Sequence, residues 1–195
     1  MMKVWGIREN RGERNQGSNK VKQRQQRRPR LMVRVLPEDG SGRMRRIDPD
    51  DVRYYFTGGA WIGGVIERRW ITQLFPDGSG GVMDWRDVPI HVDGLYVRTE
   101  EGVFRLVKIR SLSQVVEKVG GDLLRPHQSV LINEDWIHDY SPVRAEIGVL
   151  VDGSDGKSRC ERVQVSLRNK AFVDRHLLDT EDPEGSSEPD PEEDS

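Results

Sequence analysis

Two short segments of the chain, Arg125–Ser129 and Arg168–Lys170, bring together side chains that could do chemistry. Their guanidinium, amide and ammonium groups donate hydrogen bonds, and such groups bond the phosphates of a nucleic acid or the edges of its bases. Gln can pair with N6 and N7 of adenine, whereas Arg pairs with O6 and N7 of guanine. These residue types favour binding over catalysis.

Arrangements that would indicate an enzyme are weak. Ser129 lies two residues after His127, but it is not in a Gly-x-Ser-x-Gly setting. Asp135, His138 and Asp139 lack a recognised metal-ligand spacing, and no Gly-x-x-x-x-Gly-Lys loop occurs to hold a nucleotide. We therefore expect no catalytic residues, no cofactor and no metal site.

Several of these side chains also have a purely structural interpretation. His127 and Ser129 could bond nearby backbone where a strand begins, because short polar side chains commonly satisfy local backbone groups. Asn133 is expected to cap a turn. Arg168 could be an ordinary surface charge at the start of a helix.

The elements that position these residues are mostly strands. Apolar and polar residues alternate in short runs, and Gly, Pro and Asp clusters separate the runs. The pattern predicts strands at Leu31–Leu36, Val52–Phe56, Trp70–Phe75, Val88–Val92, Leu95–Thr99, Val103–Ile109, Val130–Ile132, Trp136–Tyr140, Ala145–Val151 and Arg162–Ser166. Asp93-Gly94 and Glu101-Gly102 are expected as hairpin turns.

One helix is well signalled. Ser111 and Gln114 form a capping box, an apolar stripe follows at helical spacing, and Gly120-Gly121 ends it. A short final helix is expected from about Asn169 to Leu178. The fold class predicted from these patterns is mainly β, with one or two short helices.

Two further features of the N-terminal half leave alternatives open. The segments from Val33 and from Ile71 both run into Pro-x-Asp-Gly-Ser-Gly-like turns and are followed by Asp51-Val52 and Asp87-Val88. This echo is either a duplicated hairpin or the chance reuse of one turn chemistry. The Trp61–Trp70 segment, with its paired Arg, is either a dimer or ligand surface or ordinary packing around tryptophan.

Charge divides the chain into three parts. Residues 1–30 carry a net charge of +8 and residues 179–195 carry −9, while the whole chain has −2. Both ends are nearly free of apolar residues, so we expect a disordered basic arm and a disordered acidic tail. No apolar run is long enough for a membrane span or a signal peptide. The single cysteine, Cys160, excludes an internal disulfide and fits a reducing cytoplasm.

The segment from Leu124 to Ile137 resembles the signature of the LytTR family of DNA-binding domains. In that signature an apolar residue precedes Arg-x-His-Arg/Lys-Ser, and an apolar strand and an Asn follow. Ser111-Leu112 resembles the family's helix start, and Val165-Ser166-Leu167-Arg168 resembles its closing Val-Ser-x-Arg. The resemblance covers about Trp70 to Leu178. It departs at Gln128, where the family usually has Arg, Lys or Asn.

The resemblance implies an elongated β-fold that lays its connecting loops into successive major grooves of DNA. It places Gln128 and Arg168 at base-contact positions and makes Arg125, Asn169 and Lys170 candidates for backbone contacts. The DNA-binding set that we infer is Arg125, His127, Gln128, Ser129, Arg168, Asn169 and Lys170.

The sequence as a whole predicts a bacterial, cytoplasmic transcription regulator that binds double-stranded DNA and has no membrane contact. It divides into a basic arm (1–30), an N-terminal β extension or insertion (31–69), a LytTR-like domain (70–178) and an acidic tail (179–195). If the domain instead starts at Leu31, residues 58–86 are an insertion. In the family that the motifs resemble, the domain often follows a phospho-receiver module of about 120 residues. Only about 70 residues precede the match in this sequence, so we expect no receiver module. The alternative function is a protein-interaction module on the same fold, and a homodimer or a regulatory protein partner is possible.

Overall fold

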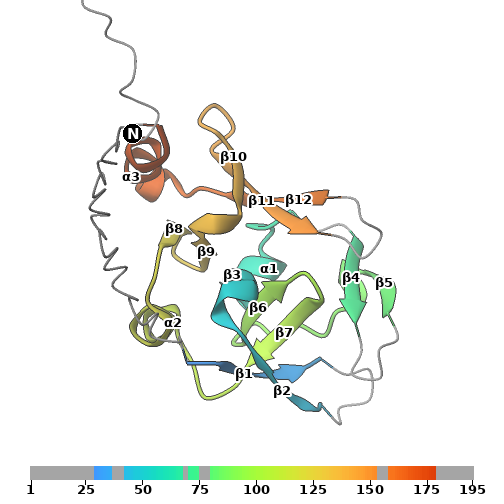
Figure 1. Cartoon of the computed structure of the whole chain (residues 1–195). Coiled ribbons are helices and arrows are strands. Elements are labelled where there is room, and N and C mark those ends of the chain that lie inside the picture. Colours follow the sequence, from blue (N-terminus) through green and yellow to red (C-terminus); the bar gives the residue numbers. More distant parts are fainter. Residues whose placement is uncertain (1–28, 37–41, 68–69, 75–79, 153–157, 179–195) are drawn as a thin grey trace, which may run out of the picture.

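A computed structural model describes residues 29–36, 42–67, 70–74, 80–152 and 158–178 (Figure 1). The predicted arm and tail therefore lie outside the described residues, apart from Pro29 and Arg30. The main element is a seven-stranded antiparallel sheet in the order β2-β1-β7-β6-β3-β9-β8. Its strands are β1 (Leu31–Val35), β2 (Met44–Ile47), β3 (Val52–Thr57), β6 (Leu95–Thr99), β7 (Gly102–Leu106), β8 (Leu123–His127) and β9 (Val130–Asn133).

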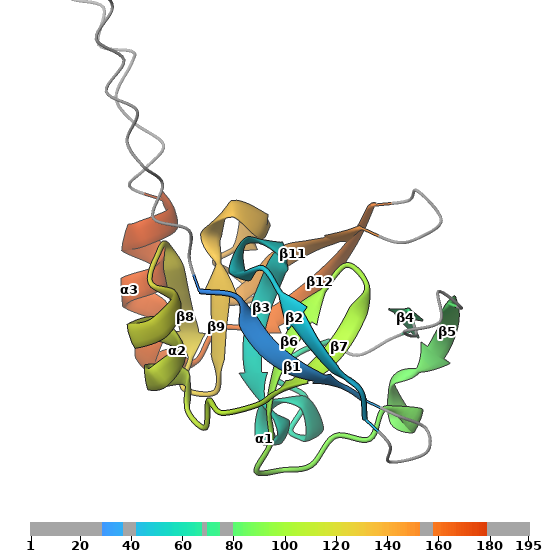
Figure 2. The same ribbon diagram turned by 60° about the horizontal axis from the view of Figure 1, so that its bottom comes forward.

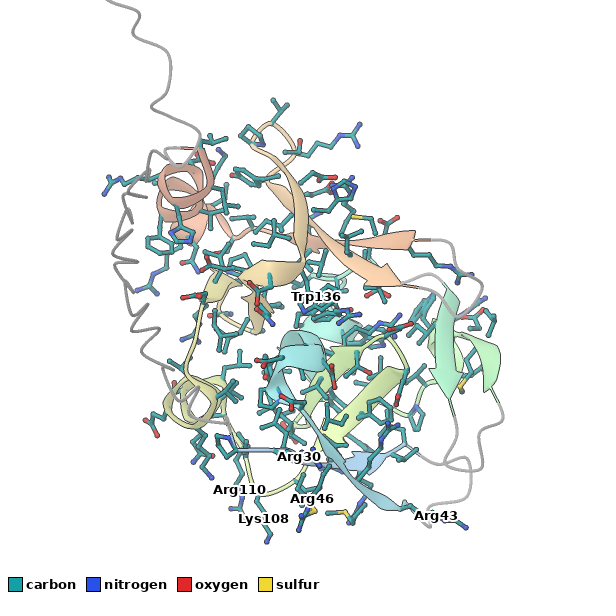
Figure 3. All side chains as sticks on the ribbon, viewed as in Figure 1. Arg30, Arg43, Arg46, Lys108, Arg110 and Trp136 are labelled. Carbon is teal, nitrogen blue, oxygen red and sulfur yellow. The ribbon has the colours of Figure 1, made fainter. Side chains whose placement is uncertain are left out.

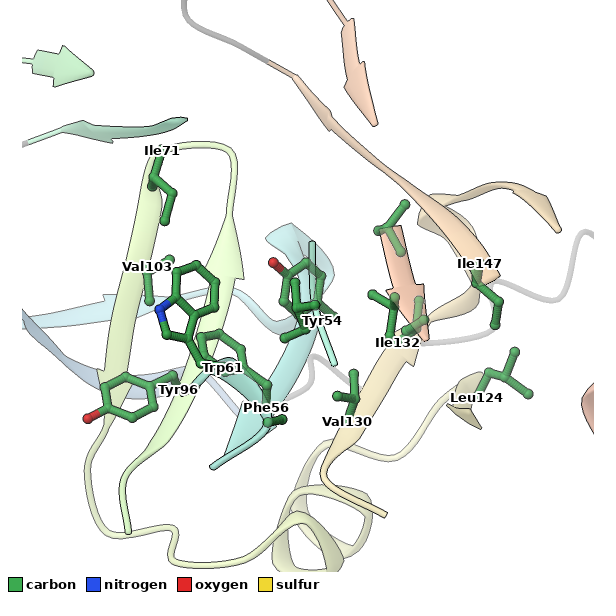
Figure 4. Packing of buried hydrophobic residues seen from close by; sticks show 14 of the residues in the cluster. Tyr54, Phe56, Trp61, Ile71, Tyr96, Val103, Leu124, Val130, Ile132 and Ile147 are labelled. Atoms are coloured by element: carbon green, nitrogen blue, oxygen red, sulfur yellow. The ribbon is translucent and has the colours of Figure 1, made fainter. Parts of the chain in front are cut away.

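Apolar side chains cover both faces of this sheet. In β3, Tyr54 and Phe56 enter one buried cluster while Tyr55 between them enters the other, because successive side chains of a strand point to opposite faces. Phe56 stacks on Trp61 and on Tyr96 at centroid distances of 5.1 and 5.5 Å (Figure 4). Trp61, from α1 (Gly58–Ile62), is thus a core residue, and the packing interpretation holds for it.

Helix α2 (Leu112–Val119) covers the second face, and its ends follow the sequence signals. The Ser111 hydroxyl accepts a hydrogen bond from the Gln114 amide at 3.2 Å, and the Gln114 side chain accepts one from the Arg110 amide at 2.9 Å. Gly120 ends the helix with φ of +61°, a conformation that glycine adopts without strain. Leu112, Val115 and Val119 of the apolar stripe are buried against the sheet, whereas Val116 of the same stripe is 47% exposed.

Two smaller sheets complete the described part of the chain (Figures 1 and 2). β10 (Ile137–Ser141), β11 (Glu146–Asp152) and β12 (Ser158–Gln164) form a three-stranded antiparallel sheet, which continues into α3 (Leu167–Leu178). β4 (Trp70–Leu74) pairs only with β5 (Gly80–Asp84). The mainly β class predicted from the sequence is confirmed.

A buried ionic cluster joins the three-stranded sheet to the main sheet. The Arg98 guanidinium in β6 donates to both carboxylate oxygens of Glu161 in β12, with Nε–Oε1 and Nη2–Oε1 distances of 3.0 and 2.9 Å. The Tyr54 hydroxyl donates to the same carboxylate. Burial, followed by the charge of Glu161, raises the pKa of Tyr54, so this phenol stays protonated.

The echoed segments are both hairpins, β1–β2 and β4–β5, and each is followed by a 3-10 turn with an Asp cap. Asp48 accepts from the Asp50 amide before Val52, and Asp84 accepts from the Arg86 amide before Val88. The succession occurs again at β8–β9, where Asn133 caps Glu134–Trp136 before Ile137. Because the third case lacks the Gly-Ser-Gly loop, the capped 3-10 turn recurs independently of that loop.

Some predicted elements are wrong. Val88–Val92 is not a strand. The chain at its C-terminal end lies beside Gly58-Gly59: the Gly58 amide donates to the Gly94 carbonyl at 2.8 Å, and the Gly59 amide donates to the Val92 carbonyl at 3.1 Å. A Cβ at Gly58 would lie 1.9 Å from the His91 carbonyl oxygen, so only glycine fits. Trp136 belongs to a 3-10 turn instead of β10. The sequence reading also missed β2, β5, β8 and α1.

The predicted boundary at residue 70 does not coincide with a break in the main sheet. β1, β2 and β3 are strands of the same sheet as β6 to β9. Residues 31–57 therefore supply three of the seven strands of the main sheet. The segment that includes β4 and β5 separates β3 from β6 along the chain, although β3 and β6 are hydrogen-bonded neighbours in the sheet.

Candidate nucleic-acid interface

The two segments singled out from the sequence meet where α3 begins beside β8. The Ser166 amide donates to the Pro126 carbonyl at 3.0 Å, and the Ser166 hydroxyl lies 3.3 Å from the same oxygen. The Asn169 side-chain amide donates to the Arg125 carbonyl at 2.9 Å. We call this contact, residues 125–129 and 166–170, the β8–α3 junction. It joins residues about 40 positions apart by short bonds to backbone.

The β8–β9 turn within the junction is stiffened by its own side chains. His127 Nδ1 accepts from the Ser129 amide at 3.2 Å, and Arg125 Nη2 donates to the Gln128 carbonyl at 2.9 Å. Burial lowers the pKa of His127, which favours the neutral ring that this acceptor role requires. Both His127 and Ser129 are half-buried, so the structure places them as supports of the turn.

Two long polar side chains of the junction are exposed and have no bonding partner within the described part of the chain. These are Gln128, at the tip of the β8–β9 turn, and Arg168, in the first turn of α3. Gln128 lies two residues after Pro126 and Arg168 lies two residues after Ser166, and the bond from the Ser166 amide to the Pro126 carbonyl joins the two segments. Their backbones are therefore held, while their amide and guanidinium groups remain available to a ligand.

Lys170 and Asn169 are less available. Lys170 Nζ lies 2.7 Å from Asp174 Oδ2 one helical turn later, and Asp174 also accepts from the Tyr140 hydroxyl of β10. Burial and this hydrogen bond raise the pKa of Tyr140 to about 12. The pKa of Asp174 is lowered, first by Lys170 and then by Tyr140. The Tyr140–Asp174 hydrogen bond links α3 to β10, and the bond from Asn169 to the Arg125 carbonyl links α3 to β8.

Asn133 has the capping role expected from the sequence. It is buried, its Oδ1 accepts from the Asp135 amide at 3.3 Å, and its Nδ2 donates to the Val52 carbonyl at 3.2 Å. Pro126 lies in β8, an edge strand of the main sheet, where a missing donor is tolerated.

The sequence reading missed exposed residues beside the junction. Val143 and Arg144 lie in the β10–β11 turn, and the carbonyl of the next residue, Ala145, accepts from the Val165 amide at 2.7 Å. Val143 is 95% exposed and Leu167 is 89% exposed. The sequence marks a turn at Pro142, between two predicted strands. It does not indicate that this turn lies near the start of α3.

Other site types find little support in the described residues. No group of three or more His, Cys, Asp and Glu side chains there could hold a metal ion. None of the described helices combines the length and the apolar character needed to cross a membrane.

Comparison with known proteins gives a structural likeness. Among solved structures, the chain is similar to a LytTr DNA-binding domain of a protein from Bacillus cereus, with a TM-score of 0.37 and 16% sequence identity. The match covers 77% of this chain and 98% of that one. That is the kind of domain that the sequence motifs resemble. No family model and no curated protein matches the chain.

Proposed function

We propose that this protein is a sequence-specific DNA-binding transcription regulator of a bacterial cytoplasm, and that the β8–α3 junction reads its target. One observation carries the proposal: the exposed Gln128 and Arg168 side chains project from two segments whose backbones are bonded together. Base readout requires side chains with donors and acceptors held at defined positions. The junction supplies both the functional groups and the support.

The residues of the junction divide into two roles. Gln128 would bond adenine N6 and N7, and Arg168 would bond guanine O6 and N7, from loops placed in the major groove. Arg125 uses Nη2 on the Gln128 carbonyl and keeps other donors for a phosphate. His127, Ser129, Asn169 and Lys170 would act mainly by holding the turn and the helix in place.

The test begins with selection of bound duplexes from a random pool, which supplies a preferred sequence. We expect Arg168→Ala to weaken binding to that sequence by about tenfold to a hundredfold, the usual loss for a bidentate base contact. The matched control is Arg175→Ala, an exposed cation in the last turn of the same helix, which should bind like the parent. Circular dichroism should be unchanged in both.

Retained affinity and sequence preference in Arg168→Ala, at one fixed salt concentration, would contradict the role of Arg168. Failure of the selection to yield any preferred sequence would contradict sequence-specific binding altogether.

The protein-interaction alternative is favoured by exposed apolar side chains near the same junction. Phe172 is 59% exposed and stacks on His176, and Leu167 and Val143 are nearly fully exposed. Apolar side chains gathered on a surface are typical of protein interfaces. Salt separates the two functions, because DNA affinity falls steeply with salt and an apolar contact does not. Phe172→Ala should then abolish a homodimer or partner complex while leaving DNA binding intact.

A further inference from the structure

The opposite edge of the main sheet carries a second set of cations that the proposed function does not use. They come from β1, β2, β7 and the segment that leads to α2. Figure 3 shows several of them along the lower margin of the molecule, beneath β1 and β2. We call this set the basic edge: Arg34, Arg43, Arg46, Arg105, Lys108 and Arg110.

The strand register places three of these cations on one face. Leu31, Val33 and Val35 of β1, Phe104 and Leu106 of β7, and Ile47 of β2 enter the core cluster beneath the sheet. By the two-residue period of a strand, Arg34, Arg46 and Arg105 point to the other face.

Arg34 and Arg105 are direct cross-strand partners, so like charges stand opposite one another. Such a pair destabilises a sheet in the absence of a counter-ion.

Lys108 and Arg110 extend the set beyond the strands. Lys108 has a φ of +68°, an uncommon conformation for a residue other than glycine, and the chain there turns from β7 toward α2. Ile109 between them is buried, so the two cations flank an anchored residue and are themselves exposed. The turn therefore presents both charges to solvent.

None of the six members of the basic edge forms an ion pair within the described part of the chain. Arg45, Arg86, Arg98 and Arg162 each contact a carboxylate. Arg46 lines a hollow of balanced charge, since the lining includes four arginines, Arg46 among them, and four carboxylates. By contrast, the hollow lined by Arg34, Arg105, Lys108 and Arg110 contains one carboxylate, that of Asp93.

We propose that the basic edge is a second DNA contact, one that holds the phosphate backbone without reading sequence. The inference rests on the proposed function for the identity of its partner. Unpaired, exposed cations suit a regularly charged polyanion. The basic arm is continuous with the edge in sequence, since Lys20, Lys22, Arg24, Arg27, Arg28 and Arg30 precede β1 directly.

The sheet sets the distance between the two DNA contacts. β2 is one edge strand and β8 is the other, so six strand spacings separate them. At about 4.8 Å per spacing, β2 and β8 are at most roughly 29 Å apart, and β7, which carries Arg105, is only four spacings from β8. These separations are shorter than the ~34 Å of one turn of B-DNA, so a duplex lying across the strands would meet the junction and the basic edge within one helical turn.

The test removes three exposed charges together as Arg43→Gln, Arg46→Gln and Arg110→Gln. The matched control removes three described cations outside both surfaces, as Arg86→Gln, Lys118→Gln and Arg175→Gln. Affinity is measured between 50 and 200 mM salt for the selected duplex and for a scrambled duplex of equal length. A charge-retaining triple with Lys at positions 43, 46 and 110 is the rescue.

We expect the edge triple to weaken binding to both duplexes by the same factor. The slope of log affinity against log salt should become less steep by about 2 to 3, since each phosphate contact contributes about 0.9. The Lys triple should restore the slope, and the control triple should change it by less than about one contact. In an ethylation-interference experiment, the phosphates whose modification loses its effect in the edge triple should lie within one turn of the bases that Arg168 contacts.

Two outcomes separate this inference from the proposed function. If the parent protein selects a sequence but the edge triple behaves like the control, the basic edge is not a DNA contact and the proposed function stands. A higher DNA affinity in the edge triple than in the parent would also overturn the inference. It would mean that the basic edge binds another ligand, such as the acidic tail. If no sequence is preferred but the triple weakens scrambled-duplex binding, the edge stands and specific recognition fails.

Discussion

The β8–α3 junction and the basic edge lie at opposite edges of one sheet and are built in opposite ways. The junction contains few free charges, and short bonds to backbone carbonyls hold its segments together. The edge has six cations without ion pairs in the described residues and no comparable network of side-chain bonds to backbone. One surface is positioned by hydrogen bonds, and the other is defined by its charge.

The contrast follows from the range of the forces involved. A hydrogen bond to a base edge weakens steeply outside a narrow range of distance and angle, so the side chain that makes it must be held. Attraction between a cation and a phosphate extends over a Debye length of roughly 10 Å, so exposed flexible side chains suffice. A protein that both finds and reads DNA gains from having one surface of each kind.

The largest expected effect comes from loosening the link between the sheet that leads into α3 and the sheet that bears the edge. Glu161→Gln removes the charge partner of the buried Arg98, and breaking a buried pair of this kind costs about 3–5 kcal/mol in the free energy of unfolding. Urea denaturation measures it. The double variant Arg98→Met, Glu161→Leu should be less destabilised than Glu161→Gln. Equal losses would contradict a cost that comes from leaving the buried Arg98 charge without its partner.

A smaller effect sharpens the role of positioning at the junction. Asn169→Ala removes the bond to the Arg125 carbonyl and should cost about 0.5–1.5 kcal/mol in stability, the usual net value of a hydrogen bond. Affinity for the selected duplex should fall several-fold, because α3 is held less firmly, while affinity for a scrambled duplex stays the same. An equal fall for both duplexes would contradict a positioning role. Arg175→Ala, which changes an exposed residue in the last turn of α3 outside the junction, is the control.

The smallest effect is a pH dependence at the β8–β9 turn. Burial places the pKa of His127 in the folded protein below its unfolded value, so the unfolded chain takes up the proton first as pH falls. Stability from this group is fully present above the unfolded pKa, about 6.5, and is lost as pH falls toward the folded pKa.

His127→Asn keeps an acceptor near the position of Nδ1 but does not titrate. Thermal unfolding of this variant should therefore lose less stability between pH 7 and pH 5 than the parent does. An identical pH profile for the two proteins would show that His127 contributes nothing to it.

Local features of the fold could be predicted from the sequence because their causes are local. Ser111, Gln114 and Gly120 mark both ends of α2, alternating residues mark β1, and short runs of strand-favouring residues mark β3 and β6. β2 escaped prediction because Met44-Arg45-Arg46-Ile47 has one buried residue, as befits an edge strand. Val88–Val92 looked like a strand, but its Val88 and Ile90 amides donate to nearby carbonyls of the same segment of chain, and the Val92 carbonyl accepts from Gly59.

The same distinction between local causes and contacts with distant segments applies to the candidate site. The sequence by itself determined which side chains can bond DNA and where Asn133 would cap, since those properties depend on residue type and immediate neighbours. Tertiary structure decided that Ser166 meets Pro126, and that Lys170 is paired whereas Arg168 is exposed. It also decided that cations scattered from Arg34 to Arg110 form one edge. Such groupings depend on strand order and register, which arise from the burial of the whole core.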